Sequence, residues 1–201
     1  MFVTIPQNER TRDKWDLEEN LGFVSFYHNG KIYKVRNTGN DVDNTIMHYL
    51  GFIDQYYQKI KEEIYKCRTL GNCRNEAILF VKTPTDFQEI PVNNIFEGVN
   101  KPKFIIRCDN DGLYFAKDND YRATRRHIML SLRTKQGKPR SWSSVKKLLL
   151  HELAHTMCNH CTYREEGNHQ EDFNKSENFL KELVSSSVPL REMEQKGIYF
   201  L

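Results

Sequence analysis

The chain has 201 residues, 38% of them hydrophobic and 28% charged, and its formal net charge is only +3. This length suffices for one domain with a core, and the charge balance lacks the strong excess of basic residues typical of nucleic-acid-binding proteins. No apolar run approaches the roughly 20 residues of a membrane helix, so no membrane partner is expected. The 5 cysteines, at irregular spacings, indicate reduced thiols and not a disulfide framework.

The N-terminal segment, residues 1–20, is polar and charged, and is expected to form an arm ahead of a single domain at 21–201. It contains no apolar stretch of the signal-peptide type, so an intracellular, non-secreted protein is expected. The domain is expected to begin with a β-hairpin, because short apolar-rich runs at 23–27 and 31–35 flank Asn29-Gly30, a dipeptide typical of tight turns.

A long helix is predicted from Asp41 to about Cys67, with Asp41 or Asp43 as its N-terminal cap. Its apolar residues recur at spacings of three and four and would therefore share one helical face. These residues are Ile46, Leu50, Ile53, Tyr57, Ile60 and Ile64. The hairpin and this helix, at 23–67, would precede a second part of the domain at about 77–201.

Several strands and two helices are predicted in the second part. Apolar runs predict the strands, and these runs are 77–81, 104–107, 113–116 and 127–132. The polar turn at 109–112 separates the second and third of them. One helix would start at Ser141, Ser143 or Ser144 and end near Asn159, and another would run from Gln170 to about Val184. The order of the elements indicates the α+β class, with a small mixed or antiparallel sheet.

The most informative motif is His151-Glu152-Leu153-Ala154-His155, an H-E-x-x-H sequence in the first of these two helices. Residues four apart lie on one helical face, so His151 and His155 can direct their imidazoles at one metal ion. Glu152 lies at the edge of that face, where its carboxylate can reach a water molecule on the metal. Two ligands and a base form the core of a zinc peptidase site, so Zn2+ is the expected cofactor and Glu152 the expected catalytic residue.

A catalytic zinc site needs a third protein ligand. His160 and Cys161 follow shortly after the second histidine, but Cys158 occupies the position at which the long zincin motif has a turning glycine. His169 is the preferred candidate, because a polar loop can return the chain over the site and the packing of the next helix would hold the ligand rigidly. A surface histidine in the first turn of that helix is the alternative.

The strand at 127–133, the helix with H-E-L-A-H and the segment His169-Gln170-Glu171-Asp172-Phe173 resemble the WLM family of zinc metallopeptidases, which is related to the SprT/Spartan proteases. The family pattern is H-E-L-x-H, a loop, and then H-x-x-x-F at the start of a helix. The resemblance covers about residues 127–201. Gly197-Ile198-Tyr199 and Tyr33-Lys34-Val35-Arg36-Asn37 are also similar to segments in WLM-type proteins of large DNA viruses.

The resemblance implies a zincin-like metallopeptidase in which His151, His155 and His169 hold zinc and Glu152 is the catalytic acid and base. A viral member would work in the host cytoplasm, the nucleus or the virion. The loop before His169 is longer than in cellular members of the family. Its additional residues without a family counterpart are Cys158, His160 and Cys161.

The expected function is that of a zinc-dependent metalloendopeptidase that hydrolyses a polypeptide substrate. Tyr163, Arg164 or His160 would stabilise the oxyanion. The strand at 127–133 would pair, as an edge strand, with an extended substrate, and a plain core strand is the alternative. An alternative function is that of a non-catalytic protein- or nucleic-acid-binding module, in which a fourth ligand such as Cys158 or Cys161 closes a structural zinc site. Hydrolysis of another substrate, such as a cell-wall or small amide, is a third possibility that no feature of the sequence favours. Glu152 favours the enzyme, because a structural site has no use for it. The oligomeric state stays open.

The family resemblance also implies that the substrates are DNA-associated or DNA-crosslinked proteins. Two basic clusters can contact phosphate, namely Arg122, Arg125 and Arg126, and Lys135, Lys138, Arg140, Lys146 and Lys147. Trp142, beside the second cluster, can stack on a base. A solvated charged surface and a core tryptophan are the alternatives, and the low net charge favours them.

Overall fold

The computed structural model describes residues 22–28, 30–69, 85–90, 98–103, 106–109, 112–115, 125–157 and 171–198. These residues form helices and three small sheets, which confirms the mixed α+β class. None of the helices within these ranges is both long enough and apolar enough to span a membrane.

A β-hairpin begins the described chain, as predicted from Asn29-Gly30. β1 (Phe23–His28) pairs antiparallel with β2 (Lys31–Arg36), and Gly30 between them has a φ of 79°. A positive φ is the conformation that a tight hairpin turn requires and that glycine adopts without strain. Tyr33 and Val35 alternate with polar residues along β2, and both are buried against the rest of the molecule.

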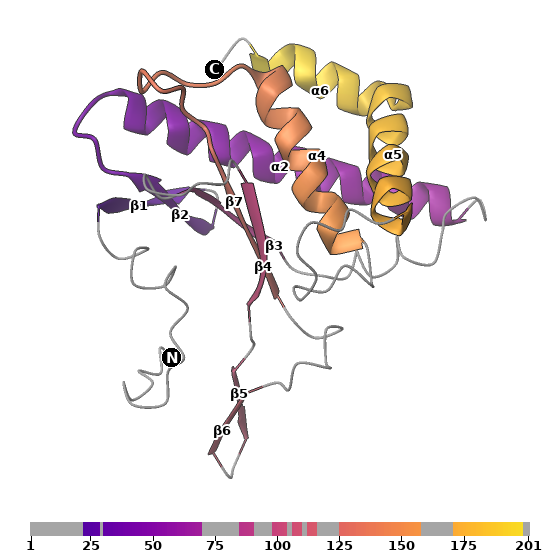
Figure 1. Ribbon diagram of the computed structural model, residues 1–201, viewed down its shortest axis with the longest axis horizontal. Helices are drawn as coiled ribbons and strands as arrows, with labels where there is room; N and C mark the ends of the chain where they lie inside the picture. The colour runs from indigo at the N-terminus through magenta and orange to yellow at the C-terminus, as the bar shows by residue number, and fades with distance from the viewer. Residues whose placement is uncertain are drawn as a thin grey trace.

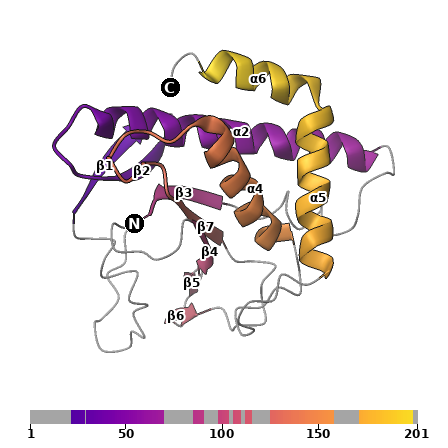
Figure 2. The ribbon, with the colours of Figure 1, turned by 45° about the horizontal axis from the view of Figure 1, so that its top comes forward.

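The predicted long helix is confirmed as α2 (Val42–Thr69), which runs from the hairpin behind α4 to α5 (Figures 1 and 2). All six apolar residues that predicted it are buried in the core. Asp41 stands directly before the helix. The expectation that Asp43 caps the helix is wrong, because Asp43 lies inside the first turn. Its carboxylate accepts hydrogen bonds from the backbone N–H groups of Thr38 (2.9 Å) and Gly39 (3.1 Å), which precede the helix.

The central sheet has the strand order β3-β7-β4. β3 (Thr85–Glu89) lies parallel to β7 (Arg125–Leu130), and β4 (Gly98–Lys103) lies antiparallel to it, so the sheet is mixed. β7 corresponds to the strand predicted at 127–132. Since both of its sides are hydrogen-bonded, β7 is the central strand, and the expectation that it is a substrate-binding edge strand is wrong.

A second hairpin is formed by β5 (Ile106–Asp109) and β6 (Gly112–Phe115), which pair antiparallel on either side of the predicted turn. The strands predicted at 104–107 and 113–116 are therefore confirmed, with bounds shifted by one or two residues. The strand predicted at 77–81 lies outside the described residues.

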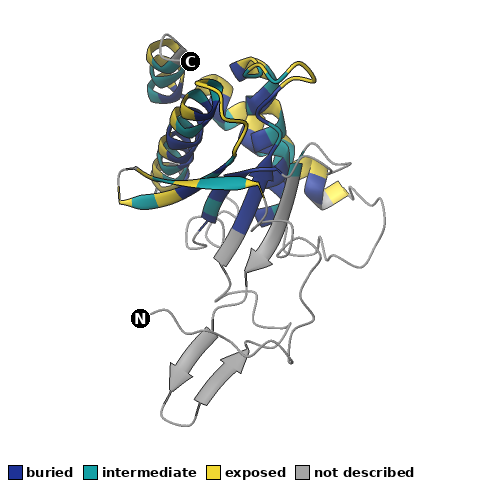
Figure 3. Ribbon diagram, turned by 90° about the vertical axis from the view of Figure 1, so that its left-hand side faces the viewer, coloured by how far each residue is buried: buried dark blue, intermediate teal, exposed yellow. Residues whose placement is uncertain are grey.

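Three further helices lie within the described residues: α4 (Trp142–Met157), α5 (Glu171–Ser186) and α6 (Val188–Ile198). The first two confirm the predicted helices, and the sequence did not predict the third. α5 packs beside α4, and α6 then runs back along α2 (Figure 2). Burial is concentrated where these helices, α2 and the central sheet face one another (Figure 3).

Candidate metal centre

α4 carries the whole H-E-x-x-H motif. The helix begins directly after Ser141, whose carbonyl accepts hydrogen bonds from the N–H groups of Ser144 and Val145 (both 3.1 Å). Its apolar residues recur at helical spacing and fix one face of α4 in the core. They are Val145, Leu149, Leu150, Leu153, Ala154 and Met157. His151 and His155 lie half-buried at the border of this face.

The two motif histidines lie together, as the spacing of four predicted. Their ring centroids are 5.1 Å apart and the ring planes meet at 82°. Phe173 of α5 packs against both rings, at centroid distances of 5.0 Å from His151 and 4.5 Å from His155. This arrangement allows one nitrogen from each imidazole to reach a common ion, and imidazole nitrogen is a preferred ligand of zinc.

A carboxylate from α5 contacts the first histidine. Glu177 Oε1 lies 3.3 Å from Nδ1 of His151, and Lys181 Nζ donates to the other oxygen of Glu177 at 2.8 Å. Partial burial by itself would raise the pKa of Glu177, but the lysine and then the histidine lower it below the usual range of a glutamate. At neutral pH Glu177 is therefore a carboxylate, which accepts hydrogen bonds and donates none.

Glu152, the expected catalytic residue, is only 5% exposed, and burial raises the pKa of its carboxyl to about 7. Burial has this effect because the charged form loses its hydration. A carboxyl with a pKa near neutrality can accept a proton and release it again under ordinary conditions, which is the task of a general base. The environment of Glu152 therefore suits the role predicted from the motif.

β4 approaches α4 at Glu152, and Gly98 is the point of closest approach. A Cβ atom on Gly98 would lie 2.5 Å from Oε1 of Glu152 and 2.8 Å from Cδ1 of Leu148, so a larger residue would displace these side chains. Among the described strands, β7 alone pairs with β4, which makes β4 an edge of the described sheet. An edge strand therefore runs directly beside the buried carboxyl.

The third ligand is not tested by the described residues. His169 lies outside them, as do the alternatives His160 and Cys161 and the oxyanion candidates Tyr163 and Arg164. Within the described ranges, no group of three or more His, Cys, Asp or Glu side chains is arranged to hold a metal ion. His151 and His155 thus fit two of the ligand positions of a zinc site, and the remainder of the site stays a prediction.

The predicted base-stacking role of Trp142 is wrong. Its side chain is 7% exposed and packs edge-on against Phe52 and Tyr56, at centroid distances of 4.8 Å and 4.9 Å. The alternative of a core tryptophan is confirmed. Lys146 of the adjacent basic cluster forms an ion pair with Glu194 of α6 at 2.7 Å. The exposed members of this cluster are Lys135, Lys138 and Lys147.

Comparisons of the chain with protein-family models, with curated proteins and with solved structures give no match in any of the three. The function is therefore inferred from the residues around α4. Two of these residues, Glu177 and Gly98, were not singled out from the sequence. Phe173, Glu177 and Lys181 recur at the helical spacing of four, and this pattern could have indicated that they share a face. No comparable signal marked Gly98.

Proposed function

We propose that this chain is a zinc-dependent metalloendopeptidase with a zincin-like site, similar to the WLM peptidases. The observation that carries the proposal is the packing around α4. It brings His151 and His155 together against Phe173 and buries Glu152 beside β4. Two zinc-type ligands next to a buried carboxyl suit hydrolysis, whereas a structural zinc site has no use for the carboxyl.

In the proposed reaction, His151, His155 and His169 would hold a zinc ion, and zinc bound there would supply Lewis-acid chemistry for hydrolysis. Glu152 accepts a proton from the attacking water and passes it to the leaving amine, so that one water molecule is added across the peptide bond. The burial of Glu152 assists the first transfer, because it lowers the cost of protonating the carboxylate.

The substrate would bind as an extended peptide along β4. β4 is the candidate substrate-binding strand in place of β7, because β7 is already paired on both sides. An added strand hydrogen-bonds through its backbone, so binding by β4 would accept many sequences. The contact between Gly98 and Glu152 would bring the bound backbone close to the carboxyl. Extended segments, such as those in unfolded or partly unfolded proteins, are the expected substrates.

The resemblance to WLM peptidases extends the proposal to DNA-associated or DNA-crosslinked substrates inside a cell. The exposed Lys135, Lys138 and Lys147 support a contact with phosphate, whereas the buried Trp142 removes the base-stacking part of that expectation. Replacement of these three lysines by glutamine should weaken binding of the protein to duplex DNA and reduce the salt dependence of that binding. Unchanged binding would remove DNA from the proposal.

The test of the proposed function combines zinc content with cleavage of unfolded casein. Wild type should hold about one zinc and cleave casein, and His169→Ala should lose most of the zinc. Glu152→Gln should keep the zinc and lose about 100- to 10,000-fold of the cleavage rate, the usual contribution of a general base. Glu182→Gln is the matched control, because Glu182 is exposed on the neighbouring helix. Zinc without cleavage in the wild type, or full cleavage by Glu152→Gln, would overturn the proposal.

A further inference from the structure

Glu177 lies in the interface between α4 and α5, where it contacts the first of the two motif histidines. Its side chain is 18% exposed and that of His151 is 33% exposed, so their contact is partly shielded from solvent. Each oxygen of Glu177 has a distinct contact, since Oε1 lies 3.3 Å from Nδ1 of His151 and Oε2 accepts from Lys181 at 2.8 Å. Lys181 therefore restrains the carboxylate that contacts the histidine.

The chemistry of the imidazole determines what this contact does. A neutral ring carries one hydrogen, on either Nδ1 or Nε2, and the other nitrogen has the lone pair that binds a metal. A carboxylate oxygen only accepts, so its contact with Nδ1 favours the form in which Nδ1 carries the hydrogen and Nε2 carries the lone pair. Phe173, 5.0 Å from the ring by centroids, further restricts its rotation.

We propose that Glu177 is a positioning residue for the metal site: it holds the orientation and the hydrogen position of His151 so that Nε2 can bind zinc, and Lys181 holds Glu177 in place. This inference rests on the proposed function and goes beyond it, because the H-E-x-x-H motif and its third ligand do not include Glu177. Carboxylates that hold metal-binding histidines in this way generally contribute 10- to 100-fold to metal affinity.

The contact between Glu177 and His151 has a different measurable consequence if its role is purely structural. If Glu177 and His151 only join α4 to α5, their loss should lower the stability of the metal-free protein and leave its intrinsic affinity for zinc unchanged. If the ion pair between Glu177 and Lys181 only stabilises α5, its loss should likewise lower the stability of the metal-free protein and leave the affinity for zinc unchanged. Zinc affinity and metal-free stability must therefore be measured on the same variants.

The experiment uses the full chain with Zn2+ and a competing chromophoric chelator. Glu177→Ala should weaken zinc binding about 10- to 100-fold. Glu177→Gln should weaken it less, because the amide oxygen still accepts from Nδ1, and Lys181→Ala should have a smaller effect again. Glu182→Gln on the exposed side of α5 should bind zinc like the wild type. With Co2+ as the probe, the visible absorption of Glu177→Ala should change in position or intensity, which reports a rearranged ligand.

Urea unfolding of the metal-free variants provides the second measurement. The proposal expects the affinity loss in Glu177→Gln while the unfolding midpoint stays near that of the wild type. Wild-type zinc affinity and an unchanged Co2+ spectrum in Glu177→Ala would overturn the role of Glu177 and leave the proposed function standing. A wild type that binds no zinc would overturn both. Zinc binding that depends on Glu177, together with full casein cleavage by Glu152→Gln, would overturn the proposed function alone.

Discussion

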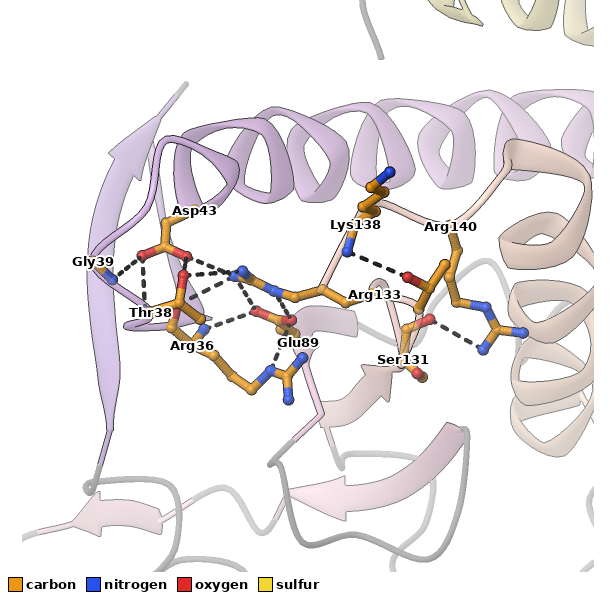
Figure 4. A network of polar contacts seen from close by, with 10 residues as sticks. Arg36, Thr38, Gly39, Asp43, Glu89, Ser131, Arg133, Lys138 and Arg140 are labelled. Atoms are coloured by element: carbon orange, nitrogen blue, oxygen red, sulfur yellow. Dashed lines mark hydrogen bonds and ion pairs between the residues drawn. The ribbon is translucent and has the colours of Figure 1, made fainter. Parts of the chain in front are cut away.

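Two buried glutamates, in different regions of the molecule, have opposite environments. Glu89, at the end of β3, is fully buried and accepts hydrogen bonds from the guanidinium Nε atoms of Arg133 (2.6 Å) and Arg36 (3.0 Å) (Figure 4). Glu152, on α4, is 5% exposed, and burial raises the pKa of its carboxyl to about 7. The first carboxylate is compensated by two cations, whereas burial destabilises the charged form of the second.

The region around Glu89 uses its buried charges to join several elements of the fold. Arg133 also forms an ion pair with Asp43 at 2.9 Å, so the cluster joins the central sheet, β2 and the start of α2. Such a cluster holds elements in register, since each charge would be costly without the others. A carboxyl whose pKa is raised by burial to about 7 is instead suited to gaining and losing a proton. The region around Glu89 is therefore structural, and the region around Glu152 is suited to a proton-transfer reaction.

The largest expected effect is that of Glu89→Gln. The substitution keeps the shape of the side chain but leaves Arg36 and Arg133 without their shared carboxylate. Breaking a buried ion pair on one side typically costs about 3–5 kcal/mol. The measurement is the free energy of urea unfolding of the metal-free protein at neutral pH. A loss below about 1 kcal/mol would contradict the structural role given to this cluster.

Gly98→Ala should lower catalytic activity through Glu152 and have little effect on the cluster around Glu89. The added methyl group would lie less than 3 Å from Oε1 and Cγ of Glu152 and from Cδ1 of Leu148, so the Glu152 side chain has to move. Because a displacement of about 1 Å can cost 100-fold in rate, casein cleavage should fall about 10- to 100-fold. Zinc content and the unfolding midpoint should stay close to the wild type. An unaltered cleavage rate would show that β4 does not constrain Glu152.

Asp43→Asn should weaken the arginine cluster and change its dependence on pH. Burial raises the pKa of Asp43, but hydrogen bonds from Thr38 and Arg133 outweigh it and bring the pKa below its usual value. A lowered pKa stabilises the fold above the unfolded value of about 3.9, and this contribution disappears as the pH falls through the folded value.

The Asn variant should therefore be less stable than the wild type by about 1–2 kcal/mol at pH 7. The difference between the two proteins should shrink as the pH is lowered below about 4. Urea unfolding of both proteins at a series of pH values measures this difference in the free energy of unfolding. A difference that is constant across the series would show that ionised Asp43 does not stabilise the cluster.

The smallest expected effect is that of Glu152→Gln on stability. Removing a buried carboxyl whose charged form is destabilised should leave the free energy of unfolding of the metal-free protein within about 1 kcal/mol of the wild type, or raise it. The same measurement on Glu89→Gln provides the contrast. Equal losses in the two variants would remove the distinction between the structural and the chemical glutamate.

Much of the fold could be predicted from local patterns. The spacing of three and four along α2, the Asn-Gly turn and the helical stretches of α4 and α5 all predicted elements that the structure contains. β3 and β4 were not predicted, because Thr85–Glu89 and Gly98–Lys103 lack an apolar run and become strands only by pairing with β7. α6 begins after a serine that acts as a helix cap, because Ser187 Oγ accepts a hydrogen bond from the N–H of Leu190 at 3.4 Å, and a serine before a helix is a signal that the sequence contains.

The sequence by itself determined the proximity of His151 and His155, because four residues make about one helical turn and no distant contact is required. The tertiary structure alone decided which residues surround them. Glu177 reaches His151 across 26 positions, and Arg133 reaches Glu89 across 44. Such pairs follow from the packing of α5 on α4 and from the strand order β3-β7-β4. Both depend on burying apolar surface between distant segments, and no local pattern in the chain encodes which of those segments will meet.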